Sequence, residues 1–165
     1  MVFITLGSQK FQFNRLLKAV DELKLDEEVF AQIGYSDYKP VNYAYKEFLD
    51  RDEFVEIMGQ ADIVITHGGT GAIISAVKKG KKVIAVPRLA KYGEHVDDHQ
   101  LQLIEQFKRL NLICACEDGD LARALEEVKN TEYKEYVSNT ERIISSIEEF
   151  IKNEYDYKKY SAVSL

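Results

Sequence analysis

The residues with the clearest chemical potential form two short runs near the middle of the chain. The first is Thr66-His67-Gly68-Gly69-Thr70-Gly71, and the second is Gly93-Glu94-His95-Val96-Asp97-Asp98-His99-Gln100. A glycine-rich turn that begins a helix leaves backbone N–H groups free at the positive end of the helix dipole, which makes a seat for phosphate. The carboxylates, imidazoles and amide of the second run suit sugar hydroxyls. Together the two runs suggest a sugar nucleotide.

The elements around these runs would place them at one edge of a sheet. The apolar run Ala61–Ile65 is typical of a buried parallel strand, and Ala72–Lys79 after the glycines is expected to be a helix closed by Gly80. The second run follows the next predicted strand, Lys82–Val86. Open α/β sheets bind ligands at the carboxyl ends of their strands. We therefore expect both runs at that edge.

A third loop of this kind follows the first predicted strand, Val2–Leu6. It contains Gly7 and Ser8, a glycine and a hydroxyl before a helix. Such a loop often does no more than cap the following helix. In a parallel sheet, however, it would open at the same edge as the His67 turn, and the two loops then support each other as a phosphate site.

The rest of the chain alternates between apolar runs and helical patterns, which predicts an α/β fold: a doubly wound, Rossmann-like parallel sheet with right-handed crossovers. The further predicted elements are the helix Phe11–Leu23, the strands Glu28–Ile33 and Val41–Tyr45, the helices Arg51–Gln60 and Gln100–Arg109, the strand Leu112–Cys116 and the helix Leu121–Val128.

The C-terminal segment has a different pattern. Apolar residues recur at helical spacing from Tyr133 to Ile151, which predicts a helix that packs across the domain and leaves surface for another chain. Asn153–Leu165 is polar, tyrosine-rich and aperiodic, as in a loose tail. We expect one domain over residues 1–152 and a flexible tail over residues 153–165.

The bulk composition is that of a cytoplasmic globular protein. The 165 residues are 45% apolar and 30% charged, and the net charge of −6 argues against nonspecific binding of nucleic acid. No apolar run approaches the roughly 20 residues that span a bilayer, and the N-terminus has no signal-peptide features. Cys114 and Cys116 are expected to be buried thiols, because no further metal ligands have suitable spacing.

Other readings of the same motifs carry less weight. Gly69-Thr70-Gly71 supplies two glycines of a dinucleotide fingerprint, but Ile74 replaces the third, so we expect no nicotinamide cofactor.

His67 is expected to be a site residue rather than a purely structural one. Asp97 or Asp98 could simply cap a helix. In that case His95 would lie outside the helix that contains His99, and since no HExxH pattern occurs we expect no metal.

At these residues the chain resembles the C-terminal domain of glycosyltransferase family 28, the donor-binding half of a GT-B enzyme. The resemblance covers roughly residues 1–150. It is closest to short stand-alone members: the catalytic subunit of the eukaryotic split N-acetylglucosaminyltransferase that acts on dolichol-linked sugar, and bacterial subunits of capsule or exopolysaccharide synthesis. It implies a hexosyltransferase with a UDP-sugar donor, a lipid-linked acceptor, inversion at the anomeric carbon and no cofactor.

The resemblance also implies roles for individual residues. Gly7 and Ser8 would approach the diphosphate or the acceptor, and the turn His67, Gly68, Gly69, Thr70 and Gly71 would hold the donor phosphates. Hydroxyls of the transferred sugar would contact Asp98, His99 and Gln100, and the backbone near Phe48 and Leu49 would edge the uracil. Larger enzymes of peptidoglycan precursors carry a ribose-binding glutamate where this chain has Ser75, a departure for which Glu94 could compensate.

A GT-B enzyme closes its cleft with an acceptor domain that this sequence does not contain. Because both substrates must be held in place, we expect a membrane-associated acceptor-binding subunit that brings the chain to the inner face of the membrane. The general base would lie on that subunit, with Glu94 and His95 as weaker candidates.

Two alternatives remain open. One is a noncatalytic sugar-nucleotide-binding or regulatory subunit. The other is a free-standing hydrolase or epimerase, whose Tyr-x-x-x-Lys spacing occurs only in a predicted loop at Tyr35 and Lys39 and in the tail at Tyr155 and Lys159.

Overall fold

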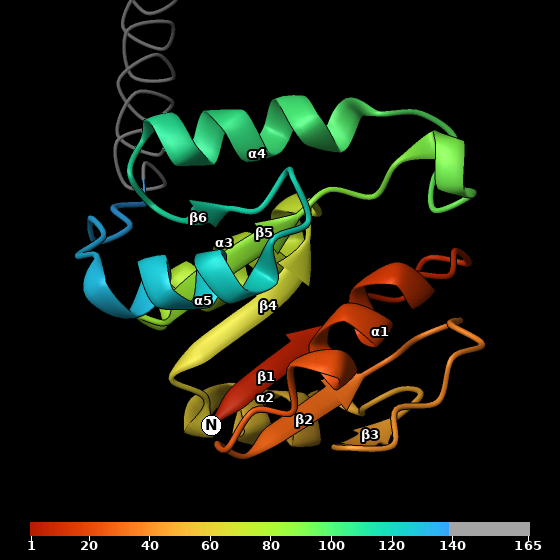
Figure 1. Ribbon diagram of the computed structural model, residues 1–165. Coiled ribbons are helices and arrows are strands. Elements are labelled where there is room, and N and C mark those ends of the chain that lie inside the picture. Colours follow the sequence, from red (N-terminus) through yellow and green to blue (C-terminus); the bar gives the residue numbers. More distant parts are fainter. Residues whose placement is uncertain (139–165) are drawn as a thin grey trace, which may run out of the picture.

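A computed structural model describes residues 1–138. Its centre is a parallel sheet with the strand order β3-β2-β1-β4-β5-β6 (Figure 1). The chain adds strands on one side of β1 as far as β3 and then crosses to the other side of β1 with β4. This doubly wound order confirms the predicted α/β, Rossmann-like fold. The strands are β1 Val2–Thr5, β2 Val29–Gln32, β3 Ala44–Lys46, β4 Ile63–His67, β5 Lys82–Val86 and β6 Cys114–Ala115.

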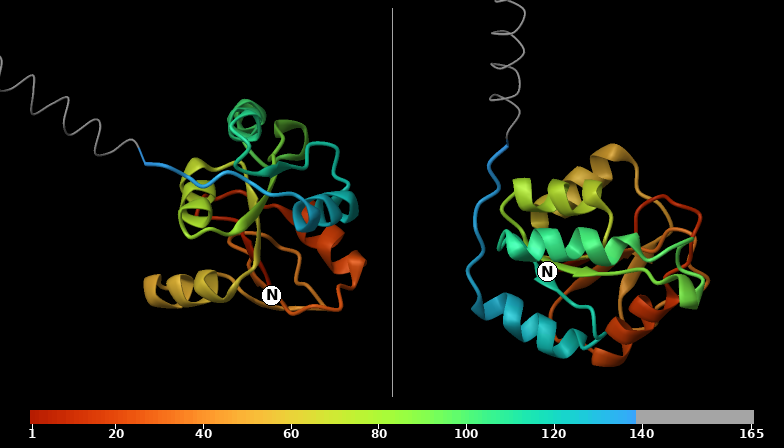
Figure 2. Two further views of the ribbon diagram at one scale, coloured as in Figure 1. Left: turned by 90° about the vertical axis from the view of Figure 1, so that its left-hand side faces the viewer. Right: turned by 90° about the horizontal axis from the view of Figure 1, so that it is seen from above.

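Helices cover both faces of the sheet (Figure 2). The helices are α1 Asn14–Leu23, α2 Arg51–Gln60, α3 Thr70–Lys78, α4 His99–Arg109 and α5 Leu121–Asn130, with a short 3-10 helix η1 at Ala90–Tyr92. Apolar residues of α1 and α5 form one core, and those of α2, α3 and α4 form the other. Successive residues of β1 alternate between them: Val2 and Ile4 face the first core and Phe3 the second. A sheet buried on both faces explains the continuous apolar strands.

Two predicted boundaries are wrong because side chains capture the backbone nearby. The third strand begins at Ala44 rather than Val41, since the N–H groups of Val41 and Asn42 donate to the buried Asp21 carboxylate at 2.9 and 2.8 Å. Helix α1 begins three residues later than predicted. The N–H of Phe13, immediately before it, donates to the Ser36 hydroxyl at 2.9 Å.

The elements around the glycine turn also differ slightly from the prediction. Strand β4 continues to His67, and α3 begins at Thr70, so only Gly68 and Gly69 separate them. The glycine turn is therefore tighter than expected, and the positive end of α3 lies directly beside the end of β4.

The last strand is shorter than predicted and contains only Cys114 and Ala115.

The two cysteines are free and buried, as predicted. Burial raises the thiol pKa values of Cys114 and Cys116 to about 12 and about 11.

The prediction of a C-terminal helix is wrong for residues 133–138, which have no regular secondary structure. The remainder of that predicted helix and the tail lie outside the described residues. Within residues 1–138 no helix has the length and apolar character needed to cross a bilayer.

Candidate functional site

The first and fourth strands bring the two glycine loops together. Strands β1 and β4 are neighbours with Thr5 opposite Thr66, and the Thr66 hydroxyl donates to the Thr5 carbonyl at 2.8 Å. The turn at Gly7 therefore lies beside the turn at His67, at the right of the sheet in Figure 1. This is the point where strand order reverses, the place where open α/β sheets bind ligands. The predicted proximity of the two loops is thus present in the structure.

The imidazole of His67 fills the space between these turns. A Cβ atom on Gly69 would lie 2.2 Å from His67 Nε2, and one on Gly7 would lie 2.9 Å from His67 Cε1. Gly7 also has a φ of +70°, a conformation that favours glycine. Both glycines are therefore required by the close approach of the ring, a reason that the sequence pattern does not show.

Burial determines the protonation state of His67. Burial, with a smaller contribution from the nearby Arg88 cation, lowers the pKa of the ring to about 4. The ring is consequently neutral at pH 7. It can offer a phosphate oxygen one hydrogen bond but no charge.

The N-terminus of α3 is open beside this ring. Its N-cap is Gly69, which has no side chain to accept from the first turn, and Thr70 and Gly71 are exposed. The N–H groups of a first helical turn have no partner within the helix, and they point along the positive end of its dipole. This arrangement is suited to an anion.

Gln100 connects the glycine turn to the end of β5. Its side chain is buried, and its Oε1 accepts from the N–H groups of Gly68 and Arg88, both at 3.0 Å. A Cβ on Gly68 would lie 2.7 Å from the Gln100 Cβ. Because both lone pairs of the oxygen are engaged, a sugar contact could come only from the amide NH₂ group.

Glu94, in the loop between β5 and α4, forms an ion pair with Arg15 of α1. Its carboxylate is 1% exposed, accepts from Arg15 Nε and Nη2 at 3.0 and 2.9 Å, and also accepts from the Leu89 N–H at 3.0 Å. Both oxygens are therefore occupied. This geometry argues against Glu94 as a general base or a ribose ligand and assigns it to holding the loop.

Arg88 is a central residue that the sequence analysis missed. Its guanidinium is buried and lies 5.1 Å from the centre of the Phe13 ring. It donates to backbone carbonyls of two loops, the one between β1 and α1 and the one between β5 and α4. Burial lowers its pKa to about 10, so it stays charged at neutral pH. Its position after a strand-ending proline is the only signal in the sequence. The accepting carbonyls are those of Leu6 at 2.8 Å, Phe11 at 2.9 Å, Gln12 at 3.2 Å and Glu94 at 3.3 Å.

The remaining polar residues of the second run lie at the start of α4. Asp98 occupies the N-cap position, but its carboxylate accepts from the Ala90 N–H at 2.8 Å instead of capping the helix. Asp97 accepts from the N–H of His99 at 3.1 Å. Asp98 and His99 are exposed and remain available to a ligand. His95 lies outside the helix, as predicted.

The residues predicted near the uracil and ribose lie further along the same edge. Phe48 follows β3, and its ring lies 5.1 Å from that of Tyr35, which follows β2. The Gly34 N–H donates to the Glu47 carbonyl at 2.8 Å, which joins the two turns. Leu49 is half-buried, and Ser75 is half-buried within α3. Tyr35 is an aromatic neighbour of Phe48 that the sequence analysis did not place there.

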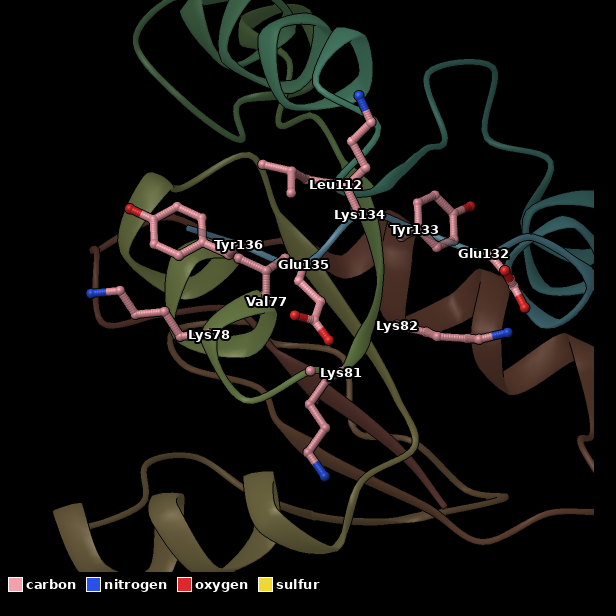
Figure 3. A pocket seen from close by; sticks show the side chains of 11 residues that line it. Val77, Lys78, Lys81, Lys82, Leu112, Glu132, Tyr133, Lys134, Glu135 and Tyr136 are labelled. Atoms are coloured by element: carbon pink, nitrogen blue, oxygen red, sulfur yellow. The ribbon is translucent and has the colours of Figure 1, made fainter. Parts of the chain in front are cut away.

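Several hollows occur in the described part of the chain, and two of them bear on the position of the site. A hollow of about 510 Å³ is lined by Arg15, Tyr92 and Glu94, beside the second run. The other, about 490 Å³, lies between α3, β5 and residues 132–136 (Figure 3). It adjoins Lys82, the first residue of β5, and is therefore at the opposite edge of the sheet. We do not assign it to the candidate site.

Comparison with curated proteins identifies relatives that share part of this chain. The UDP-N-acetylglucosamine transferase subunit ALG13 of Homo sapiens is 28% identical over 126 residues, which cover 70% of this chain and 11% of that protein. Its counterpart in Kluyveromyces lactis is 32% identical over 78 residues, which cover 46% of this chain and 38% of the relative. The chain thus spans less than half of the length of these relatives.

Solved structures share the fold. The glycotransferase of kitacinnamycin matches with a TM-score of 0.56 and 20% identity, over 79% of this chain and 35% of that one. Acinetobacter baumannii MurG matches with a TM-score of 0.51 and 19% identity, over 76% and 41%. Residues 1–156 match the model of the glycosyltransferase family 28 C-terminal domain, a region that includes every site residue described above. The protein therefore belongs to glycosyltransferase family 28 through this C-terminal-type domain, with the Rossmann-like architecture of GT-B enzymes.

Proposed function

We propose that the chain is the donor-binding, catalytic subunit of a two-chain inverting UDP-glycosyltransferase that adds a hexose to a lipid-linked acceptor. The observation that carries this proposal is the meeting of the Gly7 turn, the His67 ring and the open N-terminus of α3 at the switch point of the sheet. The relatives are named as subunits of a UDP-N-acetylglucosamine transferase, which supports both the UDP-sugar donor and a second chain.

The donor diphosphate would lie at the start of α3. The N–H groups of Thr70 and Gly71 would donate to its oxygens, neutral His67 would add one hydrogen bond, and Gly68, Gly69, Gly7 and Ser8 would allow its close approach. When the acceptor oxygen attacks the anomeric carbon, the bond to UDP breaks and its electron pair goes to the diphosphate. Backbone donors aimed at that charge stabilise the transition state without reorganisation. Neither a metal nor another cofactor is part of this proposal.

The nucleoside would extend along the edge toward β3. Neighbouring strands are about 4.8 Å apart, so Tyr35 and Phe48 lie about two and three strands from the phosphate seat at β4. An extended nucleotide would therefore place uracil near Phe48 and Leu49, with the ribose near Ser75. At the other side, Asp98 and His99 and the NH₂ group of Gln100 would contact the transferred sugar.

The second chain would bind the acceptor and supply the general base. It would be associated with the membrane and would bring this chain, a cytoplasmic protein, to the inner membrane face. The reaction would serve capsule or exopolysaccharide synthesis. Residues 1–152 would form the catalytic domain and residues 153–165 a tail.

Binding of UDP tests the donor site directly. A Cβ atom on Gly71 would meet nothing within 4 Å and requires no unusual φ, so Gly71→Ala should fold normally while a methyl group enters the phosphate seat. We expect calorimetry to show UDP binding to the wild-type chain and at least about tenfold weaker binding to Gly71→Ala, equivalent to roughly 1.4 kcal/mol.

The matched control is Gly59→Ala, since Gly59 is also unobstructed but lies in α2, away from the site. It should bind UDP like the wild type. Tighter binding of NAD than of UDP, or equal UDP affinity of both variants, would contradict the proposed donor site.

A further inference from the structure

The loop that leads into α4 brings three metal-ligating side chains to one point. His95, Asp97 and His99 occupy alternate positions, and each offers a ligand atom within 4.8 Å of the others. His95 Nδ1 lies 3.3 Å from Asp97 Oδ1, and His99 Nδ1 contacts the same oxygen. Two imidazoles thus converge on one carboxylate oxygen, although only one of them belongs to the helix.

Contacts to the rest of the domain hold the cluster in place. The His95 side chain is 8% exposed, and its ring lies 5.1 Å from that of Phe11 and 4.7 Å from that of His99. The preceding residue, Glu94, is anchored by Arg15. The ligand geometry therefore rests on an anchored loop, and only Asp97 and His99 need to adjust.

The geometry of the cluster suits a shared cation. The Asp97 N–H donates to His95 Nδ1 at 3.4 Å, which turns this nitrogen toward the carboxylate of the same residue. A nitrogen of each imidazole thus approaches Asp97 Oδ1, at 3.3 Å in the case of His95.

We propose that His95, Asp97 and His99 bind one divalent ion of the zinc class. Zinc binds imidazole nitrogen and carboxylate oxygen at about 2.0–2.2 Å, so tetrahedral ligands lie about 3.3 Å apart, close to the His95–Asp97 separation. Two imidazoles with one carboxylate favour Zn²⁺, Co²⁺ or Ni²⁺ over Mg²⁺ or Ca²⁺. Three protein ligands leave a coordination position for water or another oxygen ligand. No step of sugar transfer is assigned to this ion, since His99 bound through Nδ1 keeps Nε2 for the sugar.

Zinc titration of the chelator-stripped full chain tests this site without any donor present. The sequence contains three histidines, so imidazole NMR can follow each ring separately. We expect one zinc ion per chain, with shifts of the His95 and His99 rings and none of the buried His67 ring. Rings that respond to acid but not to zinc would show that the cluster holds a proton only and would overturn the proposal.

Ligand variants provide the second measurement, with zinc affinity determined by competition against a chromogenic chelator. Asp97→Asn and His99→Gln should each lower the affinity by at least about tenfold, the loss that even an outer-shell change can cause. Asp52→Asn, an exposed change in α2, is the control and should leave the affinity unchanged. Circular dichroism verifies that the variants fold. Equal zinc affinity of the wild type and folded Asp97→Asn would refute the site.

Discussion

Arg88 shows how one side chain can connect two loops. Its planar guanidinium reaches the carbonyls of Leu6 and Phe11 in the loop between β1 and α1, and that of Glu94 in the loop between β5 and α4. A lysine could not reproduce this fork of donors. The loop between β1 and α1 and the second polar run therefore share one buried anchor.

Removal of this anchor should destabilise the domain strongly. In Arg88→Met the carbonyls would remain buried without their donor, so the free energy of unfolding should fall by about 3 kcal/mol. Urea denaturation measures the change. The control Arg51→Met alters an exposed arginine at the start of α2 and should change stability by no more than about 0.5 kcal/mol. Equal effects of the two substitutions would contradict the role of Arg88.

His67 should make stability depend on pH. Its pKa is about 4 in the folded chain and 6.5 in the unfolded chain, so between these values the unfolded state binds more protons. The stabilisation present above pH 6.5 is therefore lost as the pH falls toward 4, by up to about 3 kcal/mol. NMR should show a His67 ring that stays neutral to about pH 4, and His67→Gln should flatten this part of the stability profile. A ring that titrates near 6.5 would contradict the prediction.

At the scale of elements, the starts of the helices determine where the turns of the candidate site lie. Helix α2 begins with a capping box in which Asp50 accepts from the Glu53 N–H at 2.9 Å and Glu53 accepts from the Asp50 N–H at 3.2 Å. Phe48 and Leu49, the predicted uracil edge, come directly before this cap. Helix α5 begins in a similar way, with Asp120 accepting from the Arg123 N–H at 3.0 Å.

The two caps form a matched pair for testing the uracil edge. Asp50→Ala and Asp120→Ala should each cost about 1 kcal/mol in thermal or urea unfolding. Only Asp50→Ala should also weaken UDP binding, because its cap holds the turn at Phe48 and Leu49, whereas α5 follows β6 at the other end of the strand order. Inorganic pyrophosphate, which lacks the base, should bind both variants alike. Equal losses of UDP affinity would show that the cap does not position the base.

At the scale of the whole molecule, the described residues form one sheet, and the proposed donor site lies at its carboxyl edge. The proposed acceptor subunit would face this edge so that both substrates meet there. The apolar stripe from Tyr136 to Ile151, predicted as an additional contact surface, lies mostly outside the described residues. The relatives are named as subunits of a transferase, and reconstitution tests whether the proposed two-chain assembly holds for this chain.

We expect the purified chain to transfer little sugar alone and to become active with a membrane-bound partner. Transfer of labelled sugar from UDP-sugar to a lipid-linked acceptor in detergent measures this. Gly71→Ala should abolish transfer in the complex if this chain binds the reacting donor. Robust transfer by the chain alone would remove the need for a partner, and an active Gly71→Ala complex would favour a noncatalytic subunit.

The sequence by itself determined the fold class and the position of the glycine turn at the carboxyl edge of the sheet. Strand and helix periodicities and the glycine turn after Ile65 are local patterns, and parallel strands necessarily gather their carboxyl ends at one edge. The tertiary structure alone decided which polar side chains hold the loops and which remain exposed. Gln100 bonds residues 32 and 12 positions away, and Arg88 reaches Leu6, 82 positions away. Contacts between residues so far apart produce no periodic pattern in the sequence, because they depend on the strand order and not on local spacing.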